Sequence, residues 1–190
     1  LEAKALTKQA DMPVGMYLDL AVGVNPGGSE TWSNQELFAL TASAGAPPDA
    51  FNLLGQTWGL PPLIPHRLYE SAYQFFVETL RFSMKYSGAV RLDHFLGLLR
   101  LFWVPQGVSC VDSAYVGYPF EDFLGILALE SHRNQCLVVG EDLGTVPEIV
   151  RERMGARGVF SYKVFYFEKQ YDGEYLPPSH YPPHSLATLG

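Results

Sequence analysis

Two acidic side chains stand at the ends of short apolar runs, where they could do chemistry. Asp93 follows the segment Ala89–Leu92, which contains Arg91, and Glu141 follows Leu137–Gly140. Side chains alternate along a strand, so Arg91 and Asp93 should share a face and His94 should point the other way. A guanidinium beside a carboxylate favours its ionised form. An anionic carboxylate held in this way can act as a nucleophile at a sugar carbon.

Glu141 has the features of a proton donor. Its side chain is longer than that of aspartate, and its neighbours Val138, Val139 and Leu143 are apolar. Partial desolvation raises the pKa of a carboxyl group and suits it to general-acid work. Retaining glycosidic enzymes place two carboxyl groups about 5–5.5 Å apart, one as nucleophile and one as acid and then base. The sequence therefore predicts Asp93 as nucleophile and Glu141 as acid/base.

Two other interpretations of the same residues remain open. Arg91 and Asp93 could form an internal ion pair, while Glu141 or Asp142 caps the next helix. His94 together with these carboxylates could hold a divalent cation. However, His94 is expected to face away from Asp93, and no second histidine stands at ligand spacing, so no metal is predicted.

The elements that position these acids alternate between strand and helix patterns. Apolar runs predict four buried strands, at residues 15–24, 89–95, 136–144 and 159–167. The helix patterns include capping boxes at Ser33 and at Thr145. Helices are predicted at residues 1–10, 33–40, 65–86, 119–133 and 145–155.

This alternation predicts an α/β fold with parallel βαβ units, either an open doubly wound sheet or part of a (β/α)₈ TIM barrel. The glycine-rich phosphate fingerprint of a dinucleotide fold follows none of the strands. Instead, Asp19, Asp93 and Glu141 stand at the carboxyl ends of three strands, which is the barrel pattern. We therefore predict a partial barrel. Four strands are half of one, and the chain does not open with Met, so we expect a fragment.

Residues 44–62 predict a long loop that covers the site. The segment is rich in proline and glycine, yet it carries Phe51, Leu53 and Trp58. A long loop in a compact domain is usually either functional or disordered, and these apolar side chains argue against disorder. We therefore predict an ordered lid loop at residues 44–62.

Composition excludes several classes of function. The 190 residues are 47% hydrophobic and 17% charged, with a net charge of −7, which fits a globular domain that does not bind nucleic acid. No apolar run is long enough for a membrane span. Neither a nucleophile elbow nor a phosphate loop is present. Cys110 and Cys136 lack metal spacing and indicate free thiols of a reducing compartment, so we expect a cytoplasmic protein.

Four motifs in order resemble those of the 4-alpha-glucanotransferases, also called amylomaltases. They are Tyr17–Val24, Pro47–Phe51 with Gly55–Pro62, Arg91–Phe95 and Gly140–Pro147. The resemblance runs along nearly the whole chain. It implies a barrel of the alpha-amylase clan, of which this chain supplies roughly strands three to six. It also implies transfer of alpha-1,4-glucan segments through a covalent glycosyl-enzyme.

The resemblance also implies roles for single residues. Asp93 would be the nucleophile, Glu141 the acid/base and Arg91 the group that orients Asp93. The substrate-binding residues would be Asp19 next to the cleaved bond, His94, and Asp49, Phe51 and Trp58 from the lid loop. No cofactor is implied, and the partners are maltooligosaccharides or starch-derived glucans, with no nucleic acid and no membrane.

The chain departs from the family pattern at its end. The third essential aspartate of the family follows a histidine after the seventh strand, and this sequence ends at Gly190, short of that motif. We therefore expect residues 1–190 to be part of one catalytic domain whose amino- and carboxyl-terminal parts are missing, and to be inactive alone. The remaining alternatives are a carbohydrate-binding fragment without catalysis and an alpha-glucan hydrolase of the same clan.

Overall fold

The computed structural model describes residues 2–189, which form short helices and two separate sheets. The α-helices are α1 (Glu2–Gln9), α2 (Ser29–Ser33), α3 (Pro65–Glu70), α4 (Gln74–Tyr86), α5 (Phe120–Asn134) and α6 (Glu148–Ala156). The 3₁₀ helices are η1 (Gln35–Leu37), η2 (Phe95–Leu98), η3 (Cys110–Asp112), η4 (Phe165–Phe167) and η5 (Pro178–His180). None of the helices in this range is long and apolar enough to cross a membrane.

The strands divide between two compact units. The first unit holds β1 (Tyr17–Leu20), β4 (Ala89–Leu92), β7 (Leu137–Gly140), β8 (Phe160–Val164) and β9 (Ser185–Thr188). The second unit holds β2 (Ala42–Ala46), β3 (Gln56–Thr57), β5 (Arg100–Pro105) and β6 (Ala114–Gly117). The first unit comprises residues up to 20, 79–96 and from 124 onward, and the second comprises residues 21–78 and 97–123.

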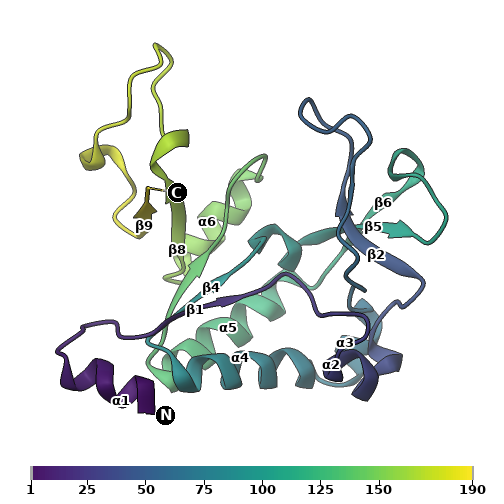
Figure 1. Ribbon diagram of the computed structural model, residues 1–190, viewed down its shortest axis with the longest axis horizontal. Coiled ribbons are helices and arrows are strands. Elements are labelled where there is room, and N and C mark those ends of the chain that lie inside the picture. The colour runs from purple at the N-terminus through teal and green to yellow at the C-terminus, as the bar shows by residue number, and fades with distance from the viewer. Residues whose placement is uncertain (1, 190) are drawn as a thin grey trace. The chain divides into compact units, whose positions relative to one another are not determined.

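The first unit is built on a parallel sheet in the order β1-β4-β7-β8-β9 (Figure 1). The four predicted strands are confirmed as β1, β4, β7 and β8, and the α/β class with them. The predicted strand at 136–144 is shorter, because pairing ends at Gly140. Strand β9 was not predicted, since four residues without an apolar run give little signal.

One face of this sheet is buried beneath helices. Val90, Leu92 and Val138 alternate with the side chains of the opposite face and are all nearly inaccessible to solvent. Helices α4 and α5 lie side by side below the strands (Figure 1). An ion pair joins them, in which Arg81 of α4 donates two hydrogen bonds, each 2.9 Å long, to the buried carboxylate of Glu130 of α5. Buried side chains of these helices, Leu80 and Met84 of α4 and Leu124 and Leu127 of α5, supply the core on this side.

The second unit contains an antiparallel sheet in the order β3-β2-β5-β6. None of the four strands predicted from the sequence belongs to this sheet. Phe102 and Val104 of β5 pack with Cys110 in a small core. The predicted lid loop at 44–62 begins within β2 and includes β3, and Phe51 between these strands is fully exposed.

The predicted helix at 65–86 is wrong in one respect, because it is two helices. Between α3 and α4 the backbone turns through left-handed conformations, with φ of 49° at Ala72 and 60° at Tyr73. The turn buries the Tyr73 ring and lets its hydroxyl donate to Asp122. The apolar repeat continues across the break, which is why the pattern did not reveal it.

Both predicted capping boxes are also wrong. Ser33 is the last residue of α2 and not the start of a helix, and η1 follows it. Helix α6 begins at Glu148 after Pro147, which makes no side-chain capping bond, and it runs one residue past the predicted end at Gly155.

Candidate active site

Arg91 joins two carboxylates on the face of the parallel sheet opposite Val90 and Leu92. Register places Asp19 of β1 directly opposite Arg91 of β4. The guanidinium donates from Nη1 to Asp19 Oδ1 over 2.6 Å and from Nη2 to Asp93 Oδ1 over 2.8 Å. Arg91 is mostly buried, whereas Asp19 is exposed and Asp93 is partly exposed. The arginine therefore fixes Asp93 while leaving part of its carboxylate open to a ligand.

Asp93 and Glu141 occupy equivalent positions at the carboxyl ends of neighbouring strands. Leu92 pairs with Gly140, so each acid is the next residue along its own strand. Two backbone hydrogen bonds join the segments just beyond the last strand pair, since Glu141 N donates to Leu92 O and Phe95 N donates to Glu141 O, both over 3.0 Å. Neighbouring strands are about 4.8 Å apart, which is compatible with the carboxyl spacing of about 5–5.5 Å in retaining enzymes.

The Glu141 carboxylate is held by two backbone N–H groups. His94 N donates to Oε2 over 3.1 Å, and Leu143 N donates to Oε1 over 2.9 Å. Burial raises the pKa of Glu141, and the charge of Asp93 raises it further, whereas Arg91 and the two N–H groups oppose the shift. The net result favours the protonated form more than in an ordinary glutamic acid.

Arg91 also lies over an aromatic ring that the sequence analysis did not single out. Its guanidinium carbon is 5.1 Å from the centre of the Tyr162 ring on β8. Burial tends to lower the pKa of Arg91, but hydrogen bonds and charge from Asp19 and Asp93 outweigh it and raise that pKa. Only the strand pairing reveals Tyr162 as a neighbour, because it is 71 residues distant in sequence.

The structure decides some of the alternatives for these residues. The ion pair between Arg91 and Asp93 is present, but Asp142 does not cap a helix, and instead accepts hydrogen bonds from α6 and β8. Within residues 2–189, no group of three or more His, Cys, Asp or Glu side chains could hold a metal ion.

His94 lies in a turn and not in a strand. Strand β4 ends at Leu92, and His94 has a φ of 48°, so the alternation used to place its side chain does not apply. Burial lowers the pKa of His94, although the charge of Asp93 acts in the opposite direction. Its backbone N–H is the group that contacts Glu141.

The predicted residues of the lid loop belong to the second unit. Asp49 Oδ1 accepts from the N–H groups of Phe51 and Asn52, over 2.8 and 2.6 Å, which shapes the tip of the loop. Trp58 Nε1 donates to Gln56 Oε1 over 3.0 Å. The structure thus gathers Asp19, Arg91, Asp93, His94 and Glu141 in the first unit, and Asp49, Phe51 and Trp58 in the second.

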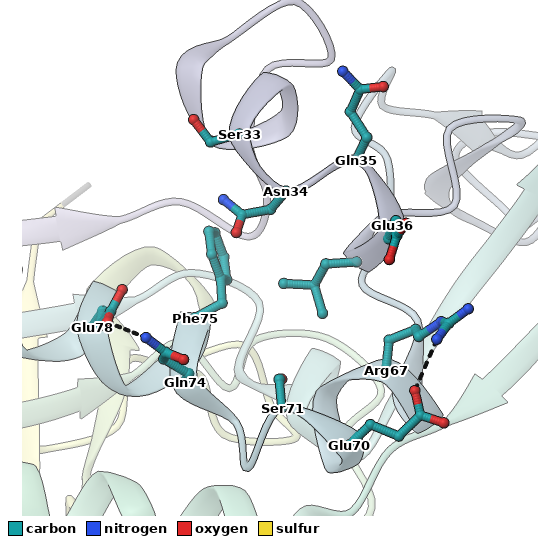
Figure 2. Close-up of a pocket in the computed structure, with 11 residues that line it drawn as sticks. Ser33, Asn34, Gln35, Glu36, Arg67, Glu70, Ser71, Gln74, Phe75 and Glu78 are labelled. Carbon is teal, nitrogen blue, oxygen red and sulfur yellow. Dashed lines mark hydrogen bonds and ion pairs between the residues drawn. The ribbon is translucent and has the colours of Figure 1, made fainter.

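The second unit also contains an open pocket of about 540 Å³ that no motif predicted. Figure 2 shows polar side chains from α2, η1, α3 and the start of α4 around it, together with the ring of Phe75. Leu37 is the other apolar residue that lines it. Two of the contacts among these residues lie each within one helix, from Arg67 to Glu70 in α3 and from Gln74 to Glu78 in α4. None of the predicted site residues lines this pocket.

Comparisons with known proteins identify the family. The family profile described as 4-alpha-glucanotransferase, glycoside hydrolase family 77, matches residues 1–190. The 4-alpha-glucanotransferase of Haemophilus influenzae is 46% identical over 97% of this chain and 26% of its own length. That of Mycobacterium tuberculosis is 41% identical over 98% of this chain and 26% of its own length. The chain thus spans about a quarter of the length of these relatives.

The solved structures that resemble this chain include two amylomaltases. Amylomaltase from Corynebacterium glutamicum superposes with a TM-score of 0.95 at 37% identity, over all of this chain and 27% of that one. Amylomaltase from Streptococcus agalactiae, solved in complex with acarbose, superposes with a TM-score of 0.78 at 22% identity, over 92% of this chain and 37% of that one, which bears on the fold alone. By its matching profile and its relatives, this chain belongs to the 4-alpha-glucanotransferase family, glycoside hydrolase family 77.

Proposed function

We propose that this chain is part of the catalytic barrel of a 4-alpha-glucanotransferase, which transfers alpha-1,4-glucan segments between maltooligosaccharides with retention of configuration. One observation carries the proposal. Asp93 and Glu141 extend side by side from the carboxyl ends of paired strands, with Asp93 held by Arg91. Barrel enzymes build their sites from such strand ends, and retaining glycosidic chemistry needs such a pair.

The strand order supports the barrel. The five parallel strands β1, β4, β7, β8 and β9 neighbour one another in the order of the sequence. A doubly wound sheet reverses its order at a switch point, whereas a barrel does not. In this proposal the strands are consecutive members of one (β/α)₈ barrel, and β9 extends the predicted set of strands three to six. Other parts of the enzyme would complete the barrel.

In the first chemical step, the Asp93 carboxylate attacks the anomeric carbon of the donor glucan, and the bond from that carbon to the leaving oxygen breaks. Glu141 gives its proton to that oxygen, for which its raised pKa is suitable. Arg91 keeps Asp93 anionic and oriented through the 2.8 Å hydrogen bond. The product of this step is a glycosyl ester of Asp93 and a shortened glucan.

In the second step, the 4-hydroxyl of an acceptor glucan replaces the leaving group. Glu141, now a carboxylate, takes the hydroxyl proton, the oxygen attacks the anomeric carbon, and the ester bond to Asp93 breaks. In this proposal Asp19 and His94 contact the sugar at the cleaved bond, and Asp49, Phe51 and Trp58 contact the acceptor. An aromatic lid that holds a sugar and excludes water favours transfer over hydrolysis.

The proposal can be tested in a chimera in which this chain replaces the corresponding 26% of the Haemophilus influenzae enzyme, to which it is 46% identical. Incubated with maltotriose, the chimera should produce both longer and shorter glucans, and acarbose should slow the reaction. Glucose and maltose without longer products would indicate the hydrolase alternative. A folded chimera that binds glucan but leaves it unchanged would contradict the proposal and indicate the binding fragment.

The same proposal includes a location in the cytoplasm. Cys110 and Cys136 are both buried and unpaired with each other, as expected for a protein of the reducing cytoplasm.

A further inference from the structure

Asp142, the residue after Glu141, is a buried carboxylate with an unusually full set of donors. Its side chain has no exposed surface. Oδ2 accepts from Ser161 Oγ over 2.6 Å and from Arg151 Nε over 3.2 Å, and Oδ1 accepts from Tyr162 N over 3.0 Å. A buried carboxylate is tolerated only when its oxygens are satisfied in this way. These contacts join the end of β7 to both α6 and β8.

Arg151 braces the turn that follows Asp142. Its Nη2 donates to Asp142 O over 3.0 Å, and its Nη1 donates to Val146 O over 3.2 Å. The guanidinium therefore contacts both the side chain and the backbone of Asp142 and the far end of the same turn. Leu143, whose N–H holds Glu141, lies within this braced segment.

Asp142 also reaches the other half of the site through Tyr162. Glu141 and Asp142 point in different directions, since the first binds N–H groups of His94 and Leu143, and the second binds β8 and α6. The backbone of Tyr162 is fixed by Asp142, while its ring lies against the guanidinium of Arg91. A single buried carboxylate is thereby connected to both Glu141 and the arginine that holds Asp93.

We propose that Asp142 is a positioning residue for the glycosyl transfer, acting together with Ser161 and Arg151. Its hydrogen bonds fix the turn that aims Glu141 and the part of β8 that places Tyr162 against Arg91. The effect of Asp142 on catalysis rests on the function proposed above, whereas its effect on the position of Glu141 does not depend on that function. If Asp142 only stabilised the fold, its partners could be changed without altering the properties of Glu141 in the folded protein.

The pKa of Glu141 reports this positioning. The charged groups that act on Glu141 are Arg91 of β4 and Asp93 just after it, whereas Asp142 and Arg151 form an ion pair with each other. The N–H groups of Leu143 and His94 lower the pKa of Glu141 by binding its ionised form. If the turn loosens and the Leu143 contact lengthens, the pKa of Glu141 should rise further. A variant without a change in charge is needed, so that the shift reports geometry alone.

The first experiment measures the Glu141 carboxyl titration by ¹³C NMR in this chain, without reference to activity. Ser161→Ala removes the 2.6 Å hydrogen bond to Asp142 and should raise the pKa of Glu141 by roughly 0.5 unit or more. Ser161→Thr keeps the hydroxyl and should restore the wild-type value. Ser185→Ala is the matched control, because Ser185 of β9 is the strand partner of Ser161 on β8, but its hydroxyl donates to Pro182 O and not to Asp142.

Asp142→Asn combined with Arg151→Gln gives a second, stronger variant that leaves the net charge unchanged. It should raise the pKa of Glu141 more than Ser161→Ala does. If Ser161→Ala is folded by circular dichroism and titrates at Glu141 as the wild type does, the proposal is overturned, whether or not the double variant folds.

The second experiment uses the chimera defined above. Ser161→Ala should lower kcat about tenfold with little change in KM, and it should move the alkaline limb of the kcat/KM profile to higher pH, because that limb reports the general acid of the free enzyme. Loss of folded protein would lower kcat without moving the limb. An inactive wild-type chimera would defeat the proposed function, while the NMR titration would still decide the role of Asp142. A titration shift without a fall in kcat would contradict positioning.

Discussion

Gly140 shows how one residue without a side chain supports both acids. A Cβ added there would lie 2.6 Å from Phe95 Cδ2 and 2.7 Å from Met154 Cε, which is closer than real contacts allow. Phe95 is fully buried, and its N–H donates to Glu141 O over 3.0 Å. The absent side chain at position 140 therefore lets this ring pack directly beneath the ends of β4 and β7.

Gly140→Ala should destabilise the chain by about 1–3 kcal/mol, the range for overpacking a filled core. Gly125→Ala is the matched control, since a Cβ at that position of α5 meets no atom within 4 Å among the described residues. Because alanine favours helix more than glycine does, the control should be neutral or up to about 1 kcal/mol more stable. Urea unfolding measures both variants. Equal stabilities would show that Gly140 does not serve close packing.

At the same scale, the sequence predicted the two acids and the arginine beside Asp93, but not the contacts that fix the turn after Glu141. Arg91 is on β4 and Asp93 is the first residue after it, so local alternation was enough to predict their contact. Asp142, Ser161 and Tyr162 meet only because β8 pairs with β7 and α6 packs beside them. Such contacts depend on tertiary structure and leave no local pattern.

At the scale of elements, helices were predicted well where burial is periodic and poorly where the backbone breaks the period. Leu68, Phe76, Leu80 and Met84 are buried at the predicted spacing, yet α3 and α4 are separated by the turn at Ala72 and Tyr73. Left-handed conformations usually attract glycine, and neither position has one. Strand β5 was also missed. Its buried and partly buried residues do not alternate strictly, so the sequence lacks the two-residue repeat that predicts a strand.

Ala72→Gly should stabilise the chain by about 0.5–1 kcal/mol. Ala72 is exposed and has a φ of 49°, a conformation that strains a residue with a Cβ and that glycine adopts freely. Ala128→Gly, within α5, is the opposite-sign control and should destabilise the chain by about 1 kcal/mol. Thermal unfolding of the two variants checks the pair. A loss of stability in both would mean that the turn is not strained.

At the scale of the whole molecule, two kinds of structure are joined in one chain. The parallel sheet of the first unit carries the acids, and the antiparallel sheet of the second carries the lid loop with Phe51 exposed. The order of strands and helices, with acids at strand ends, was enough to predict the parallel sheet. The antiparallel sheet pairs segments up to about 60 residues apart, so local sequence patterns did not reveal it.

The lid loop determines the balance between transfer and hydrolysis in our account. In the chimera, Trp58→Ala should raise the ratio of free glucose to lengthened glucans several-fold, because water reaches the glycosyl-enzyme more easily when the acceptor is held less well. Trp32→Ala is the control, since Trp32 is a largely exposed tryptophan of the same unit that lies on α2 and not in the lid loop. Chromatography of the products measures the ratio. The same ratio in both variants would remove Trp58 from acceptor binding.

The central claim is that Asp93 becomes covalently attached to the donor sugar, and intact-mass spectrometry of the chimera tests it most directly. With a fluorinated maltosyl fluoride, which slows the second step, the wild-type chimera should gain the mass of one glycosyl group, and peptide mapping should place that group on Asp93. Asp93→Asn should gain no mass. An adduct that persists in Asp93→Asn, or that maps to another residue, would contradict the account.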